Sequence, residues 1–334
     1  LVFSIYFINI FRKENREKKI IKPLILFLIL ALFFTILFWP YLWENPIQNF
    51  LYALKALSEH NPHMYTFYLG EYFLRVHSPW HYHLVWIFLT TPFLYIILFF
   101  IGFMFITQRT IKRLLKIEKN DSYDDLWRGN KELQDLLFIL TFLIPIIVAI
   151  NFRSISYDGW RHLYFIYPSF LLTSMLGLHL IKIIFFKKKN NYLHIFSIIL
   201  IIPTAFWMYK NHPFQYAYFN FLAGKNFNEK FEMDYYGVSN KSALEYIIDR
   251  DDEKIKVYNL NTTDLYLSKK ILKKEIREKI DIVHNANDAD YITNNYTDWR
   301  GETMPTKFVV PKNFKIMYEI KVDDVTINTI YKKY

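Results

Sequence analysis

The apolar residues of this chain gather in long runs instead of being spread evenly along it. Hydrophobic residues make up 53% of the 334 residues, an average that a soluble chain can also reach. Runs of about 20 apolar residues are different, because that is the length with which a helix crosses a bilayer. Four such runs are clear, at residues 20–42, 84–107, 163–186 and 192–209. Residues 136–150 form a fifth, shorter run, and residues 1–11 look like the end of a sixth.

These runs predict a multi-pass α-helical membrane protein with five full spans plus a partial one. The chain starts at Leu1 rather than Met and carries no signal-peptide pattern, so we expect a C-terminal fragment whose N-terminal part is missing. Because the chain has no Cys, it forms no disulfide. That absence does not identify a redox compartment.

Lysine and arginine residues alternate between dense and sparse loops. They are dense around residues 12–22, in the loop at 108–135 and around residues 182–189. They are sparse in loops 43–83 and 151–162, which the positive-inside rule therefore places on the outer face. The last span then exits outward, so residues 210–334 are also expected outside a plasma (inner) membrane. The net charge of +10 is mostly a topology signal, and we expect no nucleic-acid partner.

The long outer loop at 43–83 contains a predicted amphipathic helix at residues 47–58. Its apolar residues recur at helical spacing, which is typical of a helix lying in the membrane interface. The loop also carries five histidines: His60, His63, His77, His81 and His83. We expect no metal site, because neither Cys nor a tight carboxylate group completes a ligand shell. An aromatic and histidine belt facing lipid headgroups is the favoured interpretation.

The tail at 210–334 has the pattern of a small external α/β domain, separate from the transmembrane region at 1–209. Short helices are predicted at residues 242–249 and 271–279, and strands at 255–260 and 290–293. Residues 314–321 and 325–331 predict a hairpin. Three glycosylation sequons, at Asn240, Asn261 and Asn295, are attributed to chance in a chain this rich in Asn.

A short polar segment lies between the apolar runs at 136–150 and 163–186. Its residues are Tyr157, Asp158, Gly159, Trp160, Arg161 and His162. Charged groups at a bilayer surface are costly to desolvate, and polar clusters there usually serve a function. The combination suits a ligand that is half lipid and half anion.

Several motifs together resemble the GT-C membrane glycosyltransferases, in particular relatives of protein O-mannosyltransferases and lipid A aminoarabinose transferases. They are Phe38-Trp39-Pro40-Tyr41-Leu42-Trp43, Ser78-Pro79-Trp80-His81-Tyr82-His83, Tyr157 to Phe165 with Pro168, and the block from His212 to Asn220 followed by Phe231-Glu232-Met233-Asp234-Tyr235. The resemblance covers residues 38–246, and the remainder of the tail is not diagnostic.

The resemblance implies an inverting transfer of a sugar from a polyprenyl-phosphate donor to an acceptor on the outer face. The acceptor (lipid, glycan or protein) is not readable, and no cofactor is implied. An attacking hydroxyl needs a base, and a phosphate leaving group needs a fixed cation. Arg161 is the candidate cation, because a guanidinium binds phosphate bidentately. His162 could add a donor, and Asp158 could orient Arg161. The further substrate-binding candidates are Tyr157, Trp80, His81 and His83.

The catalytic carboxylate of this family lies in a first outer loop, which is expected upstream of residue 1. Glu44, Glu59 and Glu71 are outer-face carboxylates that are better interpreted as solvated loop residues. The chain alone is therefore expected to hold half a site and to be inactive. Two other classes stay open: a transporter or flippase of lipid-linked sugars, and a membrane-anchored binding protein. A transporter would favour paired ionisable residues within spans, where almost none occur beyond His179, Lys182 and His194.

Overall fold

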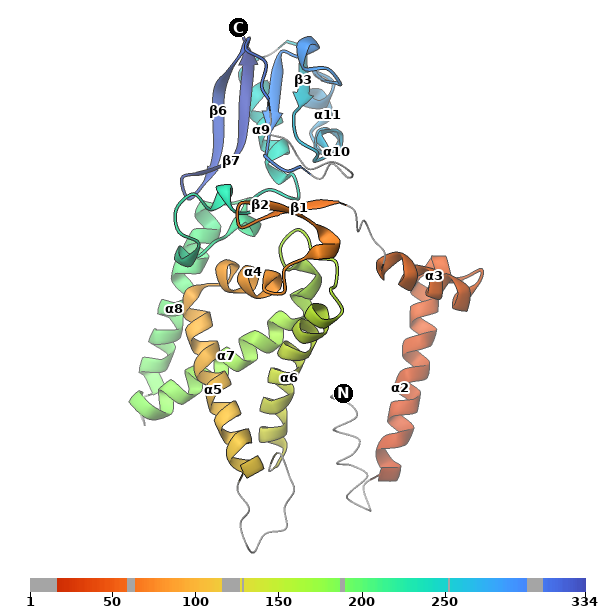
Figure 1. Cartoon of the computed structure of the whole chain (residues 1–334), viewed down its shortest axis with the longest axis vertical. Coiled ribbons are helices and arrows are strands. Elements are labelled where there is room, and N and C mark those ends of the chain that lie inside the picture. The colour runs from red at the N-terminus through yellow and green to blue at the C-terminus, as the bar shows by residue number, and fades with distance from the viewer. Residues whose placement is uncertain are drawn as a thin grey trace, which may run out of the picture.

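A computed structural model describes residues 17–58, 64–115, 127, 129–186, 190–251, 253–298 and 309–334. Helices fill the first part of the chain, and a sheet with its own helices stands on one end of them (Figure 1). The predicted partial span at residues 1–11 lies outside the described residues.

Within the described ranges, three stretches are long and apolar enough to cross a membrane. They are Phe93–Arg113 in α5 (Phe93–Leu115), the whole of α6 (Gly129–Asn151), and Arg161–Phe185, which combines η3 (Arg161–Ile166), α7 (Tyr167–Ile181) and the π-helix η4 (Lys182–Phe186). Two shorter apolar stretches, Ile25–Phe38 and Ser197–Lys210, belong to α2 (Glu17–Phe38) and α8 (Asn190–Lys210).

The predicted span at residues 84–107 is divided into two helices. The first, α4 (Tyr82–Thr90), lies across the end of the second, α5, in Figure 1. Pro92 has no amide hydrogen and pushes the preceding residue out of helical backbone, and Thr91 is extended accordingly, with φ −103° and ψ 140°. The break frees carbonyl groups, and Asn220 satisfies three of them. Its side-chain amide donates to the carbonyls of Phe88 and Thr91, and its backbone N–H to that of Leu89.

Helices α5 and α7 touch through their backbones. Gly102 of α5 faces Gly177 of α7, and a Cβ atom at either position would overlap a carbonyl oxygen of the other helix, that of Thr173 or of Leu98. Small residues that let two backbones approach are a common device for packing helices in lipid, where no hydrophobic effect drives them together.

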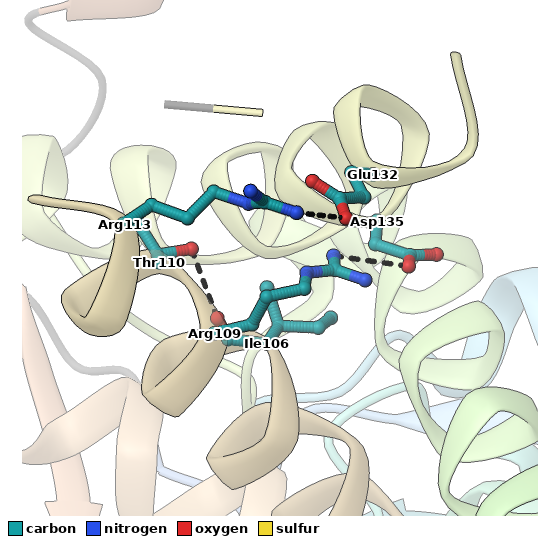
Figure 2. Close-up of polar contacts among 6 residues, drawn as sticks. All are labelled: Ile106, Arg109, Thr110, Arg113, Glu132 and Asp135. Carbon is teal, nitrogen blue, oxygen red and sulfur yellow. Dashed lines mark hydrogen bonds and ion pairs between the residues drawn. The ribbon is translucent and has the colours of Figure 1, made fainter. Parts of the chain in front are cut away.

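Two ion pairs join α5 and α6 at the end of the bundle far from the sheet. Figure 2 shows Arg109 with Asp135, 3.1 Å apart, and Arg113 with Glu132 one turn further along. These charged side chains are each only about one-fifth exposed, so their pairing is less screened than that of a surface pair. Residues 116–126 of the connecting loop lie outside the described residues.

The predicted amphipathic helix is confirmed as α3 (Pro46–Ser58). Together with α2 it stands apart from the other helices in Figure 1. Its apolar side chains are exposed within the chain, including Ile47 and Leu51. The chain then forms a hairpin that the sequence did not suggest, β1 (Tyr65–Tyr68) with β2 (Glu71–Leu74), turned by Leu69 and Gly70 at positive φ.

The tail forms one five-stranded sheet in the order β4-β3-β5-β7-β6. The strands are β3 (Ile255–Asn259), β4 (Ile280–Val283), β5 (Tyr291–Asn294), β6 (Phe314–Val322) and β7 (Val325–Lys333). Strand β3 pairs in parallel with β4 and β5, whereas β7 is antiparallel to β5 and β6. Helix α9 (Val238–Ile248) packs on the sheet, so the core joins buried side chains of α9 to those of β7.

The predicted strands at 255–260 and 290–293, the helix at 242–249 and the hairpin are confirmed by β3, β5, α9 and β6–β7. The predicted helix at 271–279 is not continuous. It is replaced by α10 (Leu265–Lys270) and α11 (Lys274–Arg277), because Leu272 turns into the core and Lys273 is extended. Strand β4 was not predicted. The three sequon asparagines are buried and hydrogen-bonded within the domain, which supports the chance interpretation.

Asp234 fastens the domain to the segment that follows α8. Its fully buried carboxylate accepts hydrogen bonds from the backbone N–H groups of Val238 and Ser239 at the start of α9, at 2.9 and 3.1 Å. It also accepts from the Tyr216 hydroxyl and from the side-chain amide of Asn295. A carboxylate at this place caps the helix and is stabilised by the helix dipole.

The α5–α7 contact yields a stability prediction. Gly177→Ala should lower the stability of the detergent-solubilised protein by about 1–3 kcal/mol, because the added methyl group meets a backbone carbonyl that cannot rotate away. Thermal unfolding measures the effect. Met175→Ala, on the exposed side of α7, is the matched control and should shift the midpoint much less. Equal shifts for both variants would contradict the close approach.

Candidate functional site

The polar segment predicted from the sequence forms a tight turn beneath the tail domain. Asp158 and Gly159 both have positive φ, at 53° and 71°. Successive residues of this kind reverse the chain, and Asp tolerates the left-handed region better than most residues. The turn carries the Asp158 side chain into the protein, where it is 4% exposed, and leads directly into η3 and α7.

Arg161 is the partly exposed cation of the site. Its guanidinium lies 3.0 Å from a carboxylate oxygen of Asp158, and its side chain is 29% exposed against 5% for that of Asp158. The same group lies over the rings of Tyr157 and Tyr236, at 4.8 and 5.8 Å from their centroids. The ion pair and the two rings hold the guanidinium in place while leaving part of it accessible.

A second arginine, which the sequence analysis did not single out, lies behind the first. Arg75, in η2 (Arg75–His77) after β2, is 3% exposed and lies 4.0 Å from the centroid of the Tyr157 ring. Its Nε donates to the Thr66 hydroxyl at 3.3 Å. Tyr157 is therefore contacted by two guanidinium groups from different segments of the chain.

Glu232 supplies a buried carboxylate opposite Arg75. It lies on the segment before Asp234, which runs beside the β1–β2 hairpin through a bridge between Tyr68 and Phe231. The Phe67 N–H donates to the Glu232 carboxylate at 3.4 Å. Burial raises the pKa of Glu232 to about 8, with Asp158 adding to the rise and Arg75 opposing it. Burial also raises the pKa of Asp158 to about 6, against the effect of Arg161 and Arg75.

One buried oxygen in this cluster, Oδ1 of Asp158, lacks a hydrogen-bond partner among the described residues. A buried polar atom left without a partner is costly, so such atoms are rare in folded proteins. Its presence beside a partly exposed arginine is typical of a site that receives a polar ligand.

The segment at residues 77–83 reaches the same region at His83. Its Nε2 lies 2.9 Å from the hydroxyl of Ser156, two residues before Asp158. Burial lowers the pKa of His83 to about 4, so this ring is neutral at physiological pH. His162 is exposed and meets the Tyr157 ring edge-on at 4.7 Å.

The other candidates of that segment lie in different surroundings. His81 contacts the Tyr68 hydroxyl through Nδ1 at 2.6 Å. Trp80 packs edge-on against His81 and is itself 66% exposed. The structure thus groups Tyr157, Asp158, Arg161 and His162, attaches His83 through Ser156, and places Trp80 and His81 beside β1. Within the described part of the chain, no group of three His, Asp or Glu side chains is arranged to hold a metal ion.

Sequence reasoning missed Arg75 and placed Glu232 only inside a longer motif. Both are single charges between apolar or aromatic neighbours, in Phe73-Leu74-Arg75-Val76 and in Phe231-Glu232-Met233. A charged residue between apolar neighbours can be buried together with them, so this pattern indicates candidate buried charges. The pattern does not reveal which opposite charge pairs with each of them.

Comparison of the chain with protein-family models, with curated proteins and with solved structures found no match in any of the three.

The buried cluster predicts a pH-dependent cost for losing Arg75. Arg75→Ala leaves Asp158 and Glu232 without their shared cation, so at about pH 9 it should destabilise the protein by about 3–5 kcal/mol. The cost should shrink at about pH 5, because both carboxyl groups then carry protons. Thermal unfolding at the two pH values measures this difference. Arg250→Ala, which removes an exposed guanidinium stacked on Tyr246, should cost little at either pH. A pH-independent loss for Arg75→Ala would refute the charge pairing.

Proposed function

We propose that this protein is a membrane glycosyltransferase that moves a sugar from a polyprenyl-phosphate donor to an acceptor on the outer face of the cell membrane. The observation that carries the proposal is the arrangement of Arg161, a partly exposed guanidinium fixed by Asp158 and two tyrosine rings at the start of an apolar helix. The GT-C resemblance of the motifs around it supplies the reaction class.

The position of Arg161 suits a lipid phosphate. It begins the stretch Arg161–Phe185, so it lies where an apolar helix leaves the hydrocarbon and meets the headgroup layer. A phosphodiester headgroup lies at that depth while its prenyl chain stays among the apolar helices. A guanidinium binds two phosphate oxygens at once, and Asp158 already holds it in one orientation.

The chemistry follows from the charges. The acceptor hydroxyl attacks the anomeric carbon, the bond from that carbon to the phosphate oxygen breaks, and the configuration inverts. The hydroxyl proton passes to a base, and the lipid phosphate leaves with one more negative charge than the donor phosphate had. Arg161 offsets that developing charge. The base is assigned, as the resemblance implies, to an outer loop preceding residue 1, since Glu44 and Glu71 are both exposed to solvent.

The proposal includes a topology with five full spans plus a partial one. The Arg161 region, the loop at 43–83 and the tail at 210–334 then lie outside. The ends of α5 and α6 that the two arginine–carboxylate pairs join lie inside. The exposed apolar side chains of α2 and α3 would face lipid and its interface in that arrangement.

Arg161→Ala should lower sugar transfer by roughly ten- to a hundredfold in membranes of cells that produce the protein together with the outer loop that supplies the base. The reason is the loss of a charge-assisted contact worth about 1.5–3 kcal/mol. Arg161→Lys should recover part of the activity, because it keeps the charge and loses the bidentate geometry. Transfer is measured with a panel of radiolabelled polyprenyl-phosphate sugars.

Arg153→Ala is the matched control, since Arg153 is an exposed arginine of the same loop. It should transfer sugar at the normal rate. A folded Arg161→Ala protein with normal transfer would end the phosphate role of Arg161. Movement of donor lipid across the membrane without transfer would instead favour a flippase.

The topology is tested with single-cysteine variants, for which the natural absence of Cys gives a clean background. Ser154→Cys and Asn287→Cys, at exposed positions, should react with an impermeant maleimide in intact cells, and Gln108→Cys only after permeabilisation. Labelling of Gln108→Cys from outside with protection of Asn287→Cys would invert the proposed topology.

A further inference from the structure

We propose that Glu232 is a proton-linked switch for the anion site at Arg161: the site binds a singly charged phosphodiester when Glu232 is protonated and loses affinity when Glu232 ionises. This inference rests on the proposed function in one respect, that the anion bound at Arg161 is a phosphodiester. It adds a regulating residue from a different part of the chain.

The argument begins with the geometry of four charged side chains. Arg161 pairs with Asp158 at 3.0 Å, and both Arg161 and Arg75 lie against the Tyr157 ring. Arg75 donates to Thr66 of β1, and Glu232 accepts from the N–H of the next residue, Phe67, so the same strand holds both groups. Contacts thus run from Arg161 through Tyr157 and Arg75 to the strand that holds Glu232; Arg161 is the most exposed of the four charged groups, whereas Glu232 is enclosed within the protein.

Every segment packed around Glu232 contributes to its charge state. Arg75 from η2 favours the ionised form, and so does the backbone N–H of Phe67 on β1. Asp158 from the turn and Asp298 after β5 disfavour it, and the Tyr82 ring of α4 is also within electrostatic range. Burial outweighs the two favourable contacts, so the neutral acid is the stable form near neutrality.

The charge of the group then depends on one proton. With Glu232 protonated, the two guanidinium charges less the one charge of Asp158 leave one positive charge, which matches a phosphodiester. With Glu232 ionised, two positive and two negative charges cancel. Anion binding and protonation of Glu232 must therefore favour each other by the same factor.

The direction with pH follows. Since the pKa of Glu232 is about 8, anion affinity should be high near pH 7 and should fall as the pH rises through that value. The pKa of Asp158 at about 6 predicts a second gain in affinity at lower pH, where Arg161 loses its carboxylate partner.

The test uses a short prenyl methyl phosphodiester, whose single charge is constant over the pH range used, and the detergent-solubilised full chain. Between about pH 7 and about pH 9, the affinity of the wild-type protein should fall roughly tenfold, the effect of one elementary charge acting over several ångströms. Glu232→Gln, which mimics the protonated acid, should keep the neutral-pH affinity at the higher pH. Glu229→Gln, an exposed glutamate of the same segment, should behave like the wild type.

A wild-type fall in affinity that persists unchanged in Glu232→Gln would overturn the proposal, as would a wild-type affinity that does not fall. Calorimetry of wild-type binding at about pH 8, in two buffers of different ionisation enthalpy, gives an answer that needs no variant. Uptake of a fraction of a proton supports the switch, and no uptake refutes it. Arg161→Ala separates the hypothesis of an anion site at Arg161 from the hypothesis that Glu232 controls it. Undiminished binding by that variant would refute the anion site itself, whatever the pH dependence.

Discussion

The structure depends on the burial of Arg75. A guanidinium with 3% exposure is tolerated only where opposite charges and aromatic rings replace its water. Near neutral pH the compensating charge is that of Asp158 in the turn after α6, and Glu232 in the segment after α8 adds a second negative charge when it ionises. These groups bring the β1–β2 hairpin, the turn and the beginning of the tail to one place. The site at Arg161 lies on the outer side of that meeting point.

The segment between α8 and α9 is anchored to its surroundings by hydrogen bonds at two residues, Asn220 and Asp234. Asn220 closes the break between α4 and α5, and Asp234 caps α9 while binding Tyr216. Glu232 lies between these two anchors, so its position is fixed from both sides. Because the Glu232 carboxyl group is buried, its charge on ionisation acts on Arg75 and Asp158 with little screening by water.

Local sequence pattern predicted the features that are local in origin. The long apolar runs, the helix at α3, strands β3 and β5 and the terminal hairpin follow from periodicity alone, and the polar turn was recognised from its place between two apolar runs. Arg75 and Glu232 were not predicted as partners, because their pairing depends on contacts between residues far apart in the sequence. The continuous hydrophobicity of residues 84–107 favoured a single span, although Pro92 lies within that run. Both α4 and α5 are apolar, so hydropathy does not change at the break between them and cannot reveal the bend.

The contact between Gly102 and Gly177 bears on the position of the Arg161 site along the axis of the helix bundle. Most helix pairs are separated by a layer of side chains that can yield, so that one helix slides past the other. Here the backbones themselves meet, and α7 has no such freedom against α5. Arg161 begins η3, which leads directly into α7, so the contact between the α5 and α7 backbones helps to set the position of Arg161 along the bundle. Substitution of the exposed apolar side chains of α5 and α7 would therefore leave the position of Arg161 along the bundle unchanged.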